Sequence, residues 1–298
     1  MIGSANVGPV KSPFRLGPRV FGETELAVMA IVNRTPDSFY DRGATFAEDA
    51  ALAAVDRAVA DGADIIDIGG VKAGPGAVVD AAEEIRRTIP TIAAVRAAFP
   101  HVVISIDTWR AEVGREAVAA GADLLNDTWA GADPGLAEVA AETGAALVCS
   151  HAGGLTPRHR PHRVGFDDVV SDVITTVTAL AERAVSLGVR RDGILIDPAH
   201  DFGKNTRHSL EITRRLGEMV DTGWPVLVAL SNKDFVGETL NVPVEERLDG
   251  TLATTAVSAW LGARVFRAHQ VRQTRQVLDV VASIRGDRPP AVARRGLA

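Results

Sequence analysis

The chain has 298 residues, of which 46% are hydrophobic, and a formal net charge of −6 at pH 7. This length suits one α/β barrel, although it would also hold two small domains. The net charge argues against a nucleic-acid binder with a broad basic surface, and no apolar run is long enough to span a membrane. Because Cys149 is the one cysteine, the chain forms no internal disulfide, and we expect a reducing compartment, the cytoplasm.

Both ends of the chain differ in composition from the middle. Residues 1–14 lack the apolar core of a signal peptide, and we interpret them as a disordered extension. Residues 286–298 contain prolines and arginines with little apolar content, which predicts a flexible tail. One domain over 15–285 is therefore expected.

Eight short apolar runs alternate with alanine-rich amphipathic stretches along this domain. Near-continuous apolar runs rich in β-branched residues predict strands that are covered on both faces, as in a parallel sheet. The amphipathic stretches, such as 47–63 and 80–99, predict helices and hence repeated βαβ units. In chain order, the expected strands are 26–32, 64–69, 102–107, 124–127, 146–151, 194–198, 226–230 and 265–269.

Eight βαβ units predict an α/β fold of the TIM (β/α)₈-barrel type. An open doubly wound sheet is the alternative, but it usually carries a glycine-rich phosphate loop after its first strand. Here the first strand is followed by NRTPDSFYDRG, which is not a dinucleotide-binding motif. Residues 12–25 are expected to form an N-terminal hairpin that covers the bottom of the barrel.

Polar side chains follow seven of the eight apolar runs. An Asp or Asn in this position often only caps the next helix, whereas Lys, Arg and His are poor N-caps. In a barrel these strand ends all face one mouth, where the active sites of this fold lie. The polar residues at the strand ends are Asn33, Asp107, Asn126, Asp127, His151, Asp197, Ser231, Lys233, Arg267 and His269.

These strand-end residues fall into two chemical groups and one candidate metal ligand. Three hydrogen-bonding side chains suit a flat, nitrogen-rich ring: Asp107, Asn126 and Asp197. Three that are cationic, or can become so, suit a phosphate group: Lys233, Arg267 and His269. Asn33 offers a neutral oxygen to a hard cation such as Mg²⁺. The implied ligand is a polar heterocycle joined to a phosphate.

Six motifs, each after a predicted strand, resemble those of the dihydropteroate synthase family over roughly residues 15–285. They are NRTPDSFYD (33–41), SIDT (105–108), ND (126–127), DPAHDFGKN (197–205), SNK (231–233) and RAH (267–269). The resemblance implies a homodimeric barrel enzyme that joins p-aminobenzoate to a dihydropterin pyrophosphate, with Mg²⁺ assisting the departure of pyrophosphate. Sulfonamide or sulfone analogues of p-aminobenzoate are implied as further ligands.

Carried over by position, the resemblance implies a role for each matching residue. It places the pterin against Asp107, Asn126, Asp197 and Lys233, and the pyrophosphate against Arg267 and His269, with Ala268 between them in the substrate site. It places Mg²⁺ against Asn33 and the aminobenzoate against Ser231. The residues that it implies as catalytic are Asp107, Lys233, Arg267 and His269.

One loop departs from the family pattern. After the second strand the family reads Asp-x-Gly-Gly-Glu-Ser-Thr-Arg-Pro-Gly, whereas this chain has Val71, Lys72, Ala73 and Gly74 at the four central positions. The family's Thr and Arg help to bind the aminobenzoate and the anion. The loss of one buried charged contact typically costs about 2–5 kcal/mol, or roughly 30- to 5,000-fold in affinity or rate. Other departures are Arg34 for Val, Ser150 and Ala152 for Met, Asn232 for Arg, and Gln270 for Asp.

We therefore expect a synthase homologue that keeps the pterin site but is weak or inactive as a transferase. The alternatives are a fully active synthase, a non-catalytic pterin- or partner-binding module, and a related pterin-dependent methyltransferase. Lys72 would supply a point charge near the lost arginine, and the basic loop 158–163 is either an anion site or simply solvated. The apolar helices 246–262 and 270–285 would form a homodimer interface or pack on the barrel.

Overall fold

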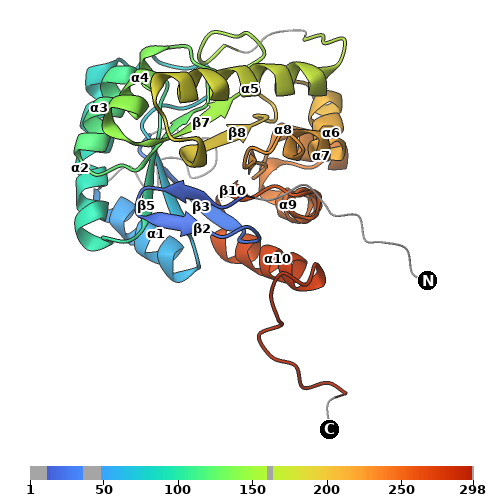
Figure 1. Ribbon diagram of the computed structural model, residues 1–298. Coiled ribbons are helices and arrows are strands. Elements are labelled where there is room, and N and C mark those ends of the chain that lie inside the picture. Colours follow the sequence, from blue (N-terminus) through green and yellow to red (C-terminus); the bar gives the residue numbers. More distant parts are fainter. Residues whose placement is uncertain (1–11, 36–47, 160–163, 297–298) are drawn as a thin grey trace.

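Eight parallel strands form the centre of the computed structural model, which describes residues 12–35, 48–159 and 164–296 (Figure 1). Their order is β8-β7-β6-β5-β4-β3-β10-β9. A bridge between Ile196 and Val226 brings the two outer strands together, and the Ile196 amide donates to the Pro225 carbonyl at 3.0 Å. The predicted barrel is therefore confirmed. The strands are β3 (Ala27–Asn33), β4 (Ile65–Gly69), β5 (Val103–Asp107), β6 (Leu124–Asp127), β7 (Ala146–Ser150), β8 (Ile194–Asp197), β9 (Leu227–Ala229) and β10 (Val265–Ala268).

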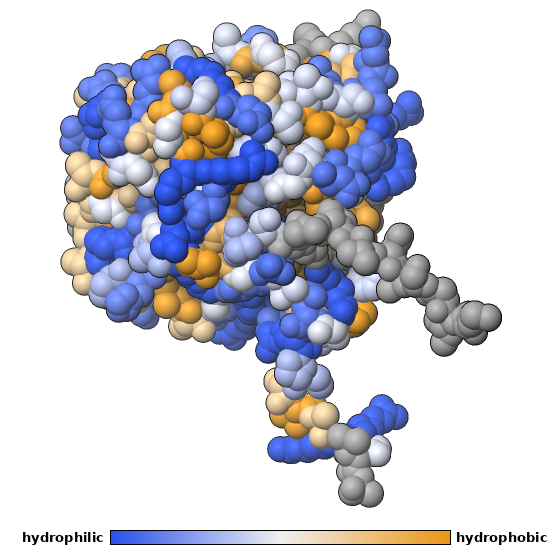
Figure 2. Space-filling model, in the orientation of Figure 1, coloured by the Kyte–Doolittle hydropathy of each residue, from blue (hydrophilic) through white to orange (hydrophobic). Residues whose placement is uncertain are grey.

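Helices surround the strands on the outside (Figure 1). They are α1 (Glu48–Ala60), α2 (Ala81–Ala98), α3 (Ala111–Ala119), α4 (Gly135–Thr143), α5 (Val169–Leu187), α6 (Thr206–Arg214), α7 (Leu216–Val220), α8 (Asp234–Leu240), α9 (Leu248–Leu261) and α10 (Val271–Ile284), with 3₁₀ turns η1 (Arg191–Gly193) and η2 (Val244–Glu246). On the face seen in Figure 2, hydrophobic and hydrophilic residues are intermingled. No helix among the described residues is long and apolar enough to cross a membrane.

Strand residues alternate between two hydrophobic clusters, because successive side chains of a strand point to opposite faces. On β7, Leu147 and Cys149 pack with the helices, whereas Ala146 and Val148 pack inside the barrel. The other strands show the same phase, for example Ile104 outside and Val103 inside on β5. This phase decides which strand-end side chains face the barrel mouth.

An N-terminal hairpin closes the bottom of the barrel, as predicted. It consists of β1 (Phe14–Leu16) and β2 (Arg19–Phe21), which pair antiparallel. The Phe14 and Phe21 rings stack with centroids 4.7 Å apart. Both rings are buried against the inner residues at the N-terminal ends of the barrel strands. The hairpin thus covers apolar groups that would otherwise face water.

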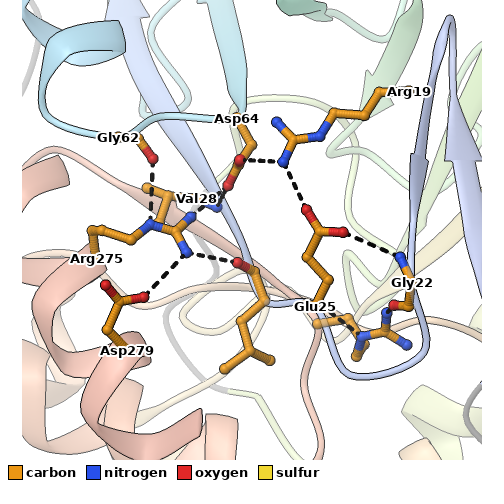
Figure 3. Close-up of polar contacts among 10 residues, drawn as sticks. Arg19, Gly22, Glu25, Val28, Gly62, Asp64, Arg275 and Asp279 are labelled. Atoms are coloured by element: carbon orange, nitrogen blue, oxygen red, sulfur yellow. Dashed lines mark hydrogen bonds and ion pairs between the residues drawn. The ribbon is translucent and has the colours of Figure 1, made fainter. Parts of the chain in front are cut away.

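Ion pairs fasten the hairpin to the barrel (Figure 3). Arg19 bridges Glu25 and Asp64, with both N–O distances at 2.7 Å. Asp64 also accepts from the Val28 amide at 2.8 Å and pairs with Arg275 of α10. The second hairpin strand and the last helix are therefore linked through one carboxylate, which lies directly before β4.

The predicted terminal segments are described only in part. Residues 1–11 of the expected extension lie outside the described residues, and β1 begins at Phe14, one residue before the expected domain boundary. At the other end, α10 ends at Ile284 and Arg285 pairs with Asp287 at 2.8 Å. No helix or strand occurs in the described residues after α10.

Candidate functional site

A cavity of about 690 Å³ opens at the C-terminal ends of the strands. The inward phase of each strand delivers polar side chains to it, because residues two apart share a face. Seven of the residues predicted from the sequence line this cavity: Asn33, Asp107, Asp197, Ser231, Lys233, Arg267 and His269. Asn126 lies fully buried beneath the wall, beside Asp67. The structure thus brings together in space side chains that are far apart in the chain.

Arg267 holds two carboxylates on neighbouring strands. Its Nε donates to Asp67 Oδ2 at 2.6 Å, and its Nη2 donates to Asp107 Oδ2 at 2.8 Å. Asp67 also accepts from Ser105 Oγ at 2.6 Å and from Asn126 Nδ2 at 3.3 Å. The guanidinium is therefore fixed in direction by a network that is almost entirely buried.

Asp67 was not among the residues predicted for the site. It is fully buried and lies in the middle of β4, two residues before the strand end, so a search of strand ends overlooks it. Its inward phase was the available signal, since an Asp inside a buried strand needs partners there. We interpret Asp67 as the group that orients Arg267 and Asn126.

The two predicted carboxylates of the ring-binding group are hard to ionise. Burial raises the pKa of Asp107 to about 7, and the Arg267 cation opposes this shift. Burial raises the pKa of Asp197 to about 6, although the Ala199 amide donates to it at 2.7 Å. Near neutral pH, Asp107 therefore exists in both protonation states and can donate or accept a hydrogen bond.

Two of the lysines that line the cavity, Lys233 and Lys204, have different surroundings. Lys233 lies 4.4 Å from the centroid of the Phe202 ring, and burial lowers its pKa. Lys204 donates to the carbonyls of His151, Ala199 and Phe202 at 3.0, 3.1 and 2.8 Å, and burial lowers its pKa to about 7. The sequence motif contained Lys204 without assigning it a role. Its hydrogen bonds to three carbonyls indicate that Lys204 stabilises the loop after β8.

His269 differs from the cationic role expected for it. Burial, with help from the Arg267 and Lys233 charges, lowers its pKa to about 3, so the ring is neutral at pH 7. It can offer a phosphate an N–H donor but no charge. Its backbone amide donates to Ser231 Oγ at 3.2 Å, and Ser231 in turn donates to Gln270 Oε1 at 3.0 Å.

The altered loop after β4 forms part of the cavity wall through Val71, Lys72, Ala73 and Gly74. Arg158, from the far side of the mouth, donates to the carbonyl of Gly74 at 3.1 Å and to that of Ala77 at 2.7 Å. The basic loop 158–163 was expected to be either an anion site or solvated. Arg158 instead holds the altered loop, whereas residues 160–163 lie outside the described residues.

Besides Asn126, three of the candidate residues at the strand ends are absent from the wall of this cavity as described. Asp127 accepts from the amides of Trp129 at 2.9 Å and Gly131 at 2.7 Å, which is a local turn-forming role. His151 Nε2 contacts Asp172 at 2.7 Å, and burial lowers its pKa to about 4. Ala268 is buried at the end of β10, between Arg267 and His269, which both line the cavity, so its own side chain points outward.

Comparison with known proteins agrees with this geometry. Residues 29–269 match the family described as "Pterin binding enzyme". The chain is 63% identical to a Mycobacterium leprae protein named "Inactive dihydropteroate synthase 2", over 91% of this chain and 94% of that protein. It is 37% identical to the Escherichia coli dihydropteroate synthase, over 85% of this chain and 90% of that protein. The Yersinia pestis dihydropteroate synthase, solved with a sulfonamide drug complex, has a TM-score of 0.87 at 34% identity, covering 93% of this chain and 100% of that chain.

Proposed function

Because this chain belongs to the family of pterin binding enzymes, we propose that it binds a dihydropterin pyrophosphate in the barrel mouth and forms dihydropteroate weakly or not at all. The chain is a dihydropteroate synthase homologue that fits the group of relatives named inactive. The observation that carries the proposal is the contrast between the two sides of the cavity. One side keeps the predicted ring-binding groups, and on the other side the loop after β4 lacks the hydroxyl and the guanidinium of the family pattern.

On the ring-binding side, the polar groups already have fixed directions. Asp107 is held by Arg267 and by Thr128 Oγ1 at 3.1 Å, and Asp197 is held by the Ala199 amide. Groups fixed before binding need no reorganisation when a ligand arrives. Carboxylates facing the ring would also stabilise positive charge that develops as pyrophosphate leaves. The pterin half of the synthase reaction therefore has support in this chain.

On the other side, the wall no longer suits an aryl carboxylate. Ala73 and Gly74 offer neither a hydroxyl nor a guanidinium. Three acidic side chains, which follow β8 and β9, also line the cavity: Asp201, Asp234 and Glu238. Like charges repel strongly where water is partly excluded, so these carboxylates disfavour the p-aminobenzoate anion. Sulfonamide or sulfone analogues, which share its aromatic amine, are proposed as weak ligands.

Mg²⁺ is proposed as the cofactor that accompanies the pyrophosphate. Asn33 lines the cavity and presents a neutral amide oxygen, a ligand type that Mg²⁺ accepts. Within the described residues, no group of three His, Cys, Asp or Glu side chains could hold a metal ion. This fits a cation held mainly by phosphate oxygens and water, with Asn33 as its protein ligand. Bound there, the ion would neutralise charge on the leaving group.

Two measurements test the proposed function. Isothermal titration with the dihydropterin pyrophosphate and Mg²⁺ should show one site per chain, and binding should weaken without Mg²⁺. With p-aminobenzoate added, dihydropteroate formation should be at least about 30-fold slower than for the Escherichia coli enzyme under the same conditions. Equal turnover would support the fully active alternative instead. No pterin binding at all would reject the ring-binding half of the proposal.

We also propose that the chain forms a homodimer through α9 and α10. These helices expose four large apolar side chains, Val257, Trp260, Val280 and Ile284, each at 49% or more of its full exposure. Exposed apolar patches of this kind commonly mark protein interfaces. A second copy would bury them, as the resemblance to a dimeric family implies.

Val257→Glu should weaken this dimer by at least about 10-fold, because an unpaired charge would be buried in the interface. Sedimentation equilibrium over a range of concentrations measures the change. Val20→Glu is a matched control, since Val20 is 48% exposed and lies on the hairpin at the barrel bottom. A wild-type monomer at all concentrations would reject the dimer. Equal behaviour of the two variants would place the interface elsewhere.

A further inference from the structure

Ser150 occupies an inward-facing position at the end of β7. Val148, two residues earlier, belongs to the cluster inside the barrel, so the phase of the strand directs Ser150 inward as well. Its Cα partner on β8 is Asp197, which is inward-facing and lines the cavity. Ser150 is thus a neighbour of a proposed ring-binding carboxylate.

The Ser150 hydroxyl is fully buried and has no hydrogen-bond partner among the described residues. Buried polar side chains are nearly always paired, because an unpaired hydroxyl loses its contacts with water and gains nothing in return. On the neighbouring strand β6, the side-chain oxygen of Asn126 is likewise buried and unpaired. Both atoms lie beneath the wall of the cavity, next to Asp107 and Asp197, which line it.

The residue type adds an independent reason to assign this hydroxyl a role. The motif that this chain resembles has methionine at position 150, which would give the ring an apolar neighbour. A serine there removes an apolar side chain and leaves a polar group without a hydrogen-bond partner in the described part of the chain. A bound ring with a polar atom on the edge that faces β7 would satisfy it.

We propose that the Ser150 hydroxyl hydrogen-bonds the ring of the bound pterin and selects rings with a polar atom on that edge. The inference rests on the proposed function, since it requires a pterin in the cavity. Ser150 is then a specificity-determining residue particular to this chain. It works beside Asn126 and Asp197, which lie on the neighbouring strands.

Ser150→Ala tests this proposal against a matched control, Ser258→Ala. Ser258 lies on α9, and its hydroxyl is also fully buried and unpaired among the described residues. Each substitution removes one unsatisfied hydroxyl, so neither should lower the melting temperature of the ligand-free protein. Titration with the dihydropterin pyrophosphate should give a dissociation constant about 5- to 30-fold higher for Ser150→Ala and unchanged for Ser258→Ala.

The outcomes separate the two proposals. If the wild type binds the pterin and Ser150→Ala binds it equally well, the role of Ser150 is overturned and the proposed function stands. An equal loss of pterin affinity in Ser150→Ala and Ser258→Ala would also overturn the role of Ser150, because the effect would then not be specific to a hydroxyl near the ring. If the wild type does not bind the pterin, the proposed function fails and the inference about Ser150 fails with it.

Discussion

The fourfold variant Val71→Glu, Lys72→Ser, Ala73→Thr, Gly74→Arg should form dihydropteroate at least about 30-fold faster than the wild type. An arginine that contacts a phosphate or carboxylate forms a charge-assisted, often bidentate hydrogen bond. One such buried contact is worth about 2–5 kcal/mol, which corresponds to roughly 30- to 5,000-fold in rate when it acts in the transition state. Steady-state assays with saturating dihydropterin pyrophosphate and varied p-aminobenzoate measure the gain.

The hydrogen bonds from Arg158 to this loop do not depend on the loop's own side chains. Arg158 holds it through the backbone carbonyls of Gly74 and Ala77, so new side chains leave both hydrogen bonds in place. The variant keeps Gly70, because a Cβ at this position would lie only 2.7 Å from Thr88 Cγ2. The graft therefore changes the chemistry of the wall with its supports intact.

Lys72→Arg alone is the control, because it adds a guanidinium at the wrong position of the loop. It should give less than about a tenth of the gain of the fourfold variant. If the fourfold variant binds the pterin and still shows wild-type turnover, the defect does not lie in this loop. The acidic wall at Asp234 and Glu238 would then be the next cause to test.

Most of the fold follows from periodicity in the sequence. Each expected strand overlaps an observed one, since eight apolar runs separated by helical patterns leave few other topologies. The same alternation explains why strand-end residues such as Asp107 and Lys233 share one cavity. Their roles toward a ligand remain predictions.

Other parts of the site depend on contacts that no local pattern encodes. Arg158 and Gly74 lie in different loops and meet across the mouth, which no spacing within either loop predicts. His269 was expected to be cationic or to become so, but its ionisation depends on burial and on the charges of Arg267 and Lys233. Both features arise only when the barrel is assembled.

Arg267→Ala should lower the free energy of unfolding by about 3–5 kcal/mol, because it leaves the buried Asp67 and the largely buried Asp107 without their cation. Arg267 pairs with Asp67 at 2.6 Å and with Asp107 at 2.8 Å, and Asp67 is fully buried. Urea unfolding at pH 7 measures the loss. Asp107→Asn in the same chain should recover part of it, since one of the two uncompensated charges is then removed.

The loss of unfolding free energy in Arg267→Ala should grow as the pH rises. The folded pKa of Asp107 is already about 7, well above the value of about 3.9 expected in an unfolded chain, so the folded state binds the proton more tightly. The contribution of Asp107 to the free energy of unfolding therefore falls as the pH rises from about 3.9 to about 7. Without Arg267 the folded pKa rises further and the window extends above pH 7. The gap between variant and wild type should thus be wider at pH 8 than at pH 5.

Arg264→Ala separates this electrostatic effect from the loss of a buried arginine as such. Arg264 is also buried, but its Nε donates to the carbonyl of Glu25 at 3.0 Å, at the bottom of the barrel, and it forms no ion pair with a carboxylate of the described residues. Its removal should destabilise the protein by an amount that is nearly the same at pH 5 and pH 8. Parallel pH profiles of the unfolding free energy for the two variants would mean that Arg267 acts by packing, and that Asp107 does not need the charge of Arg267. A steeper profile for Arg267→Ala alone would identify the two carboxylates as the groups that hold the guanidinium in the mouth.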